Sequence, residues 1–203
     1  MSFCRSILLL SLFLGLMITF SPNSQAAEHF TIAIQPLGKV DSKLIEHVKH
    51  EIQKVYKGEL IVLSPVPLPK EAYYAPRNRY RAEKLALLFD GQSKQYSKIV
   101  VITDKDISTT KADIIDWGIF GYSLLGRRPA IVSTFRLAKA GKGKRFYERL
   151  AKLVYHELGH TFGVDHCPNV GCYMQDVKGK IAVVDNWKSF CSTCQNLLSK
   201  QLK

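Results

Sequence analysis

One short run of residues constrains this chain more than any other. His156-Glu-Leu-Gly-His-Thr-Phe-Gly-Val-Asp-His166 has the spacing H-E-x-x-H-x-x-G-x-x-H. In an α-helix, residues four apart lie on one face, so His156 and His160 can hold one metal ion together. Gly163 can adopt the left-handed conformation that ends a helix, and the chain then turns back so that His166 reaches the same ion. Three nitrogen ligands leave the fourth position of a zinc ion open for water, which is typical of catalytic zinc.

Glu157 follows the first histidine and is not expected to be a ligand. Its place in the run lets the carboxylate take a proton from the zinc-bound water and pass it to a leaving amine. The alternative interpretation is a helix that carries histidines by coincidence. The complete pattern is expected by chance in roughly one chain in 100,000 of this length, so the sequence favours a catalytic zinc site.

Four cysteines follow the histidine run, and their spacing has two interpretations. The pattern C-x4-C and C-x-x-C suits two chelating loops that together hold a structural zinc ion. In an oxidising compartment an even number of cysteines equally suits disulfides. Both possibilities give the same residues a structural role in the C-terminal segment: Cys167, Cys172, Cys191 and Cys194.

The string H-E-L-G-H-T-F-G-V-D-H-C-x4-C-x-M, followed by C-x-x-C, resembles the archaemetzincins, a branch of the metzincin metallopeptidases. The resemblance is specific over residues 144–198 and looser upstream. It implies peptidase activity on a peptide or protein substrate and two zinc ions, one catalytic and one held by the four cysteines. It also implies that Met174 lies beneath the catalytic metal as an apolar floor. Some metzincins carry a zinc-binding tyrosine two residues after that methionine, but here the position is Gln175.

The N-terminal residues have the pattern of a secretory signal. Arg5 precedes an almost unbroken apolar run over residues 7–20, and Ser24-Gln-Ala26 follows as a small-residue cleavage site. The alternative is an uncleaved membrane anchor, but the run is shorter than the roughly 20 residues that span a bilayer. We therefore expect a secreted or periplasmic protein with no stable membrane insertion, whose residues 1–26, including Cys4, are removed.

The net charge of +12 raises the question of an anionic partner. The densest basic clusters are residues 77–81 and 139–145. They suit an acidic substrate, nucleic acid or a membrane face, or they are simply solvated side chains. A nucleic-acid-binding module does not account for the three histidines, so no nucleic-acid partner is expected. A catalytically silent zinc protein that binds peptides is the other alternative, although the intact Glu157 counts against it. We expect a monomer.

Hydrophobic periodicity predicts alternating strands and helices along the rest of the chain. The expected strands are residues 29–35, 60–66, 98–103 and 130–133, and the expected helices are residues 41–57, 79–89, 144–162 and 185–198. This order predicts an α/β fold of the α+β metzincin type, with a twisted mixed sheet, packed helices and a catalytic helix. Residues 27–166 would form the N-terminal subdomain, and residues 167–203 a small irregular subdomain around the cysteine zinc site.

The segment Trp117-Gly-Ile-Phe-Gly-Tyr122 is a candidate for an edge strand above the zinc ion. In metzincins such a strand pairs with an extended peptide, a form of strand addition. Tyr122 and Tyr173 are candidates for supporting the negative charge that develops on the substrate oxygen. An ordinary edge strand or loop remains the alternative for the whole segment.

Overall fold

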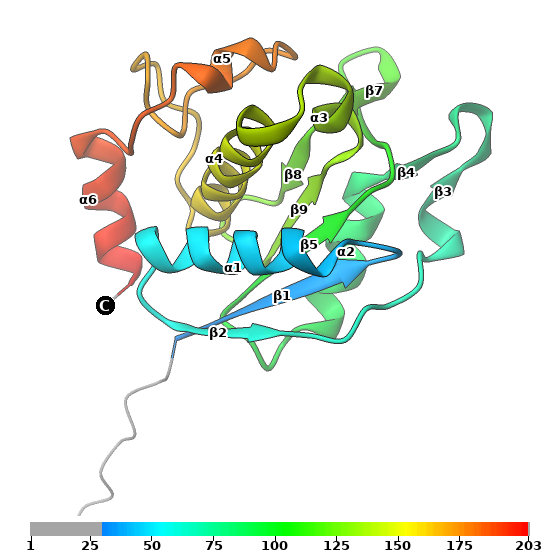
Figure 1. The fold of residues 1–203 in the computed structure, drawn as a ribbon, viewed down its shortest axis with the longest axis horizontal. Coiled ribbons are helices and arrows are strands. Elements are labelled where there is room, and N and C mark those ends of the chain that lie inside the picture. Colours follow the sequence, from blue (N-terminus) through cyan, green and yellow to red (C-terminus); the bar gives the residue numbers. More distant parts are fainter. Residues whose placement is uncertain (1–29, 203) are drawn as a thin grey trace, which may run out of the picture.

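The computed structural model describes residues 30–202 and shows an α/β fold built on a five-stranded mixed sheet (Figure 1). The strand order is β2-β1-β5-β9-β8. The first four strands are parallel, and β8 pairs antiparallel to β9 at one edge. Their bounds are β2 (Glu59–Val62), β1 (Thr31–Leu37), β5 (Lys98–Thr103), β9 (Pro129–Ser133) and β8 (Gly121–Ser123). The predicted mixed sheet with packed helices is confirmed, whereas the predicted signal over residues 1–26 lies outside the described residues.

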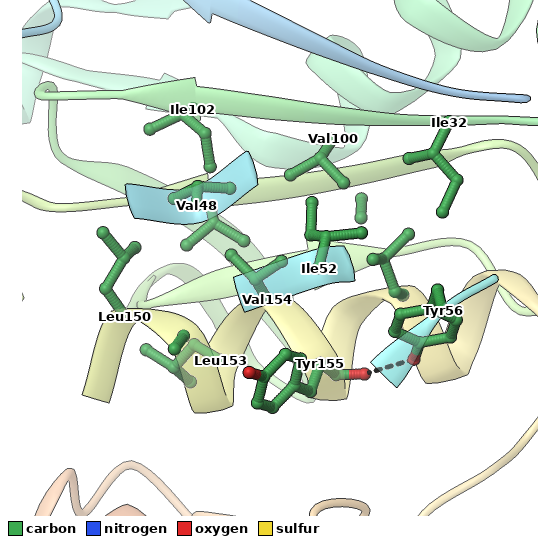
Figure 2. Packing of buried hydrophobic residues seen from close by; sticks show 14 of the residues in the cluster. Ile32, Val48, Ile52, Tyr56, Val100, Ile102, Leu150, Leu153, Val154 and Tyr155 are labelled. Carbon is green, nitrogen blue, oxygen red and sulfur yellow. Dashed lines mark hydrogen bonds between the residues drawn. The ribbon is translucent and has the colours of Figure 1, made fainter. Parts of the chain in front are cut away.

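Helices cover both faces of this sheet. α1 (Ser42–Val55) and α4 (Gly143–Thr161) pack on one face, and α2 (Ala82–Gln92) packs on the other. Successive side chains of a strand point to opposite faces, so β1 contributes Ile32 and Ile34 to the first layer and Ala33 to the second. Figure 2 shows the first layer, in which side chains of α1 and α4 meet those of β1 and β5.

Helix α4, which carries the residues predicted to be catalytic, is packed into this core along its length. Leu150, Val154 and Leu158 are fully buried, and each side chain of this kind contributes about 1.5–3 kcal/mol through burial. The phenol of Tyr56, which follows α1, donates a hydrogen bond to the carbonyl oxygen of Tyr155 at 3.0 Å (Figure 2). The helix end that carries the histidines is therefore fixed by packing that is independent of any metal.

A second, four-stranded sheet was not predicted from the sequence. Its order is β3-β4-β6-β7, with β3 (Tyr73–Tyr74), β4 (Arg79–Arg81), β6 (Ile107–Lys111) and β7 (Ile114–Ile119). The prediction of a helix from residue 79 was therefore wrong in its first turn. Tyr80 pairs with Ile107 across the sheet, and the two flanking arginines form ion pairs, so the helix begins only at Ala82.

The C-terminal segment is irregular and holds two short helices. α5 (Ala182–Asp185) and α6 (Ser192–Gln201) replace the single helix predicted over residues 185–198, which was wrong. Between them Trp187 and Phe190 turn into the core, and Ser189 bridges to Cys172, so a continuous helix is impossible there. Short helices also occur before β3, before β4 and before α4: η1 (Lys70–Ala72), η2 (Ala75–Arg77) and α3 (Phe135–Ala140). Across residues 30–202, no helix has the length and apolar character needed to cross a membrane.

Candidate active site

The three histidines of the motif come together at the C-terminal end of α4. His156 and His160 lie one turn apart, with ring centroids separated by 4.5 Å. Gly163 has a φ of 79°, so the left-handed conformation expected from the sequence ends the helix there. The chain then returns, and His166 lies with its ring centroid 4.8 Å from that of His160. One ring nitrogen from each histidine falls within 4.8 Å of the others.

The hydrogen bonds of the two helical histidines decide which nitrogen of each ring is free. His156 Nδ1 lies 2.7 Å from the carbonyl oxygen of Tyr173, and His160 Nδ1 lies 2.9 Å from that of Val164. A carbonyl only accepts, so each Nδ1 carries the proton and donates it. The two Nε2 atoms then face each other with bare lone pairs at 3.1 Å. Such a pair repels unless it shares a cation, so the donor set fits a divalent metal ion such as zinc.

Burial keeps both helical histidines neutral, which is the form that binds a metal. Burial, together with the neighbouring imidazoles, lowers the pKa of His156 well below its usual value. The same causes lower the pKa of His160 to about 4. At neutral pH both rings therefore offer a lone pair and do not compete for a proton. His166 is exposed at the mouth of the site.

Glu157 is buried in the same cleft, with an exposed fraction of 5%. The hydroxyl of Ser123 on β8 donates a hydrogen bond to its Oε2 at 2.9 Å. Gly121 lies so close that a Cβ there would be 2.3 Å from Oε1. Burial raises the pKa of Glu157 to about 8, while the bond from Ser123 lowers it. A neighbouring cation favours the ionised carboxylate. Neither Ser123 nor Gly121 was singled out from the sequence, because only the fold brings β8 onto α4.

Two side chains form the inner wall behind the histidines. Met174 is fully buried against Gly159, where an added Cβ would be 2.4 Å from its sulfur. Gly159 lies between the two helical histidines, so Met174 lies on the helix face beneath them. Trp187 stacks on the ring of His156, with centroids 5.0 Å apart and planes inclined by 17°. No spacing in the sequence linked Trp187 to the histidines, because it lies far along the chain in the segment after α5.

The site opens into a cleft of about 440 Å³. The segment Trp117–Tyr122 predicted as an edge strand divides between the end of β7 and the start of β8, and it does line this cleft. Tyr122 also lines it. Tyr173 instead packs its ring against Tyr155 and offers only its carbonyl to His156. Gln175 accepts a hydrogen bond from the backbone of Gly171 at 3.0 Å and so supports the loop.

The four cysteines form a second cluster beside the histidine site. The sulfur atoms of Cys167 and Cys191 are 3.7 Å apart, as are those of Cys172 and Cys194. A disulfide needs about 2.0 Å, whereas four sulfurs at 2.3 Å around zinc lie about 3.8 Å from one another. Hydrogen bonds, first from the backbone of Cys194, lower the pKa of Cys191 to about 6 and favour its thiolate. The geometry thus fits a tetrahedral zinc site better than a pair of disulfides.

The two clusters are joined through the backbone. The backbone nitrogen of Met174 donates to the sulfur of Cys172 at 3.4 Å, and that of Cys167 donates to the carbonyl of Met174 at 2.8 Å. The residue between Cys172 and Met174 is Tyr173, whose carbonyl orients His156. The cysteine cluster therefore holds the loop that positions a ligand of the histidine site.

The basic cluster at residues 77–81 is not free for an anionic partner as a whole. Arg79 forms ion pairs with Asp106 and Asp116, each at 2.8 Å, and Arg81 pairs with Glu83. Arg77 is exposed and lies 3.8 Å from Asp116. Part of the positive charge of the chain therefore has a structural role, because these arginines stabilise the second sheet through ion pairs.

Comparison with known sequences agrees with this geometry. Residues 37–200 match the model of peptidase family M54. The archaemetzincin of Methanopyrus kandleri is 31% identical over 171 residues, which cover 84% of this chain and 92% of that protein. The archaemetzincin of Haloarcula marismortui is 30% identical over 81% of this chain and 96% of its own length.

Solved structures give the same result. The crystal structure of archaemetzincin from Methanopyrus kandleri superposes with a TM-score of 0.75 at 28% identity, covering 88% of this chain and 98% of that one. Archaemetzincin from Archaeoglobus fulgidus, complexed with malonate, gives a TM-score of 0.70 at 29% identity, covering 83% and 99%. The chain therefore belongs to peptidase family M54, the archaemetzincins, and is a zinc metallopeptidase.

Proposed function

We propose that the protein hydrolyses peptide bonds at a zinc ion held by His156, His160 and His166, with Glu157 as the general base. The observation that carries this proposal is the placement of the Glu157 carboxylate, which is buried in the cleft and fixed by Ser123 next to the converging imidazoles. When bound at three nitrogens, zinc polarises a substrate carbonyl and lowers the pKa of water at its open position to about 7.

The histidines, Glu157 and the strand β8 have separate roles in the proposed reaction. The imidazoles hold the metal in neutral form, and the carbonyls of Tyr173 and Val164 fix their orientation. The Glu157 carboxylate accepts a proton from the attacking water and returns it to the departing amine nitrogen. Among residues 30–202, β9 is the only strand that pairs with β8, so the other edge of β8 is available for main-chain hydrogen bonds with an extended peptide.

The second zinc ion belongs at Cys167, Cys172, Cys191 and Cys194, which gives two zinc ions per chain. The sulfur separations support this assignment over disulfides. A four-sulfur site leaves no open position, so its role is structural. Elemental analysis of protein purified without added metal tests this number. Two zinc ions per chain are expected, and a single zinc ion would contradict either the cysteine site or the histidine site.

We also propose that the protein is exported, works as a monomer, and has a mature form that begins near Ala27. The support for export is the charged, apolar and small-residue pattern over residues 1–26. Mature residues 27–166 would carry the catalytic helix, and residues 167–203 the cysteine cluster. N-terminal sequencing of the protein from its own cells and sedimentation of the purified chain test these points. A retained residue 1 or a dimeric mass would contradict them.

The substitution Glu157→Gln tests the base. It keeps the size of the side chain and removes its basicity, so turnover should fall on the order of 10² to 10⁴ while zinc content is unchanged. His160→Ala is the companion variant and should lose one zinc ion together with activity. If Glu157→Gln retains full turnover, Glu157 is not the base, whereas the metal assignment still stands on the zinc content of His160→Ala.

A further inference from the structure

The hairpin of β6 and β7 forms one wall of the catalytic cleft, and three arginine side chains hold it in place. Arg79 donates to the carboxylate of Asp116 on β7 at 2.8 Å. Arg81 donates to the hydroxyl of Thr110 at 2.7 Å and to the carbonyl of Ile115. Arg136 packs so closely over Gly118 that a Cβ there would be 1.9 Å from its guanidinium. The wall is thus pre-organised, which is what a substrate subsite needs.

The face of the hairpin toward the cleft changes from apolar at its base to cationic at its tip. Thr109 pairs with Trp117 across the two strands, and Lys111 follows near the turn. The ammonium of Lys111 lies 5.2 Å from the centroid of the Trp117 ring. Thr109, Lys111 and Trp117 line the same cavity as Glu157 and His156. A cation over an indole face is held in place without being neutralised.

Trp117 also meets the opposite wall of the cleft. A Cβ on Gly179, in the loop after Met174, would lie 3.1 Å from the indole atom Cζ2 of Trp117. This approach of hairpin and loop narrows the cleft at that end. Among residues 30–202, no carboxylate lies within 4.0 Å of the Lys111 ammonium.

The other acidic side chains that line the cavity, apart from Glu157, accept hydrogen bonds from backbone nitrogens. Asp165 accepts a hydrogen bond from the backbone nitrogen of His166 at 2.6 Å. Asp176 accepts one from that of Lys178 at 2.8 Å. Among residues 30–202, Lys111 therefore carries a positive charge with no carboxylate at ion-pair distance, and it lines the cavity in which we propose that the peptide binds.

We propose that Lys111 and Trp117 form a subsite that binds a carboxylate of the peptide substrate at the end of the cleft bounded by Gly179. The inference rests on the proposed peptidase function and adds a substrate preference to it. The carboxylate pairs with the Lys111 ammonium, and the indole packs on the hydrocarbon part of the same substrate residue. Two sources supply this chemistry, namely a C-terminal carboxylate close to the scissile bond and an acidic side chain.

Matched peptides separate these sources. One short sequence is made with a free C-terminal carboxylate or an amide, and with Glu or Gln as the residue before the terminus. The wild-type protein should cleave the carboxylate form of one pair with a kcat/KM about 2- to 5-fold higher than that for its neutral form, as expected for a partly exposed ion pair. A preference for the free C-terminus over the amide shows that the subsite binds the terminal carboxylate. A preference for Glu over Gln shows that it binds an acidic side chain.

Three variants test whether Lys111 causes the preference. Lys111→Gln should lower the kcat/KM for the carboxylate form to that for the neutral form, and Lys111→Arg should keep the preference. Lys139→Gln is a matched control, because the ammonium of Lys139 also lies over an aromatic ring, that of Phe135, at 4.0 Å but outside the cleft. That control should behave as the wild type. No preference in the wild type, or a preference that survives in Lys111→Gln, overturns the proposal.

Peptide binding separates failure of this subsite from failure of the catalytic proposal. Binding of each peptide to zinc-loaded Glu157→Gln protein can be followed by tryptophan fluorescence. The chain has two tryptophans, Trp117 in the proposed subsite and Trp187. Tighter binding of the carboxylate form, lost in Glu157→Gln with Lys111→Gln, supports the subsite even if the wild type cleaves none of these peptides. Equal binding of both forms overturns it, whatever the hydrolysis result.

Discussion

The hydroxyl of Ser123 lies 2.9 Å from Oε2 of Glu157 and joins the edge strand β8 to the catalytic helix α4. Because this bond fixes one oxygen of the carboxylate, the other is left next to Gly121, on the side of the cleft. The strand proposed to pair with a peptide is thus the same strand that contacts the proposed base. The proposed mechanism therefore assigns both peptide binding and orientation of the base to three consecutive residues, 121–123.

Ser123→Ala should lower kcat about 10-fold with little change in KM, because the base loses its orientation while the peptide edge of β8 remains. Steady-state kinetics at saturating zinc measure this split. Ser123→Thr keeps the hydroxyl and should recover much of the rate. Ser97→Ala is the control, since Ser97 accepts a hydrogen bond from the backbone of Thr31 away from the cleft. A rise in KM alone would show that Ser123 acts on the peptide and not on Glu157.

Gly121→Ala should reduce turnover more strongly than it reduces stability. The added methyl would be 2.3 Å from Oε1 and 2.7 Å from the carboxyl carbon of Glu157, so the carboxylate must move. A displacement near 1 Å at a catalytic group costs about 100-fold in rate. Kinetics together with thermal unfolding measure both effects. Gly91→Ala is the matched control, because no atom lies within 4 Å of its added Cβ, and it should leave the rate unchanged.

Asp185→Asn should cost about 1.5–3 kcal/mol in the free energy of unfolding at pH 7, because it breaks charged hydrogen bonds to a buried guanidinium. Arg149 donates to both oxygens of Asp185 at 2.7 Å, and these bonds are the main reason that the pKa of Asp185 is lowered.

The pH dependence of this difference follows from the sign of the shift. A carboxylate with a lowered folded-state pKa contributes its stability above its ordinary pKa of 3.8 and loses it as the pH falls through the lower folded-state value. Urea unfolding at several pH values should therefore show a constant difference between wild type and Asp185→Asn from pH 7 to pH 5, shrinking below about pH 4. A difference that persists undiminished at pH 2 would contradict the ion pair as its cause.

Cys172→Ser should remove one zinc ion and lower the melting temperature by about 10 °C or more, because metal binding at a thiolate site contributes directly to folding. The same variant should weaken zinc binding at the histidines, since the backbone next to Cys172 positions Tyr173 and Met174. Competition with a chelator, followed by the fluorescence of Trp187 against His156, measures that second effect. Unchanged affinity at the histidines would show that the two sites are independent.

The sequence determined the parts of this protein that depend on local spacing. Helix periodicity places His156 and His160 on one face, and a glycine at position 163 permits the turn that brings His166 back. The buried strands β5 and β9 follow from runs of apolar residues, and the helix α1 follows from apolar residues spaced for one buried face. These features need only neighbours in the chain, so the pattern of residue types is enough to predict them.

Tertiary structure alone decided what surrounds those residues. The contact of Ser123 with Glu157 spans 34 residues, and that of Trp187 with His156 spans a similar stretch of chain. The second sheet was missed because its strands are short and mix charged, polar and apolar residues without a regular apolar alternation. Arg79 and Arg81 belong to a solvated or anion-binding cluster by composition, but Arg79 is half-buried and Arg81 is buried, and both form ion pairs with acidic side chains. Such contacts depend on how the sheets and helices pack, which local spacing does not encode.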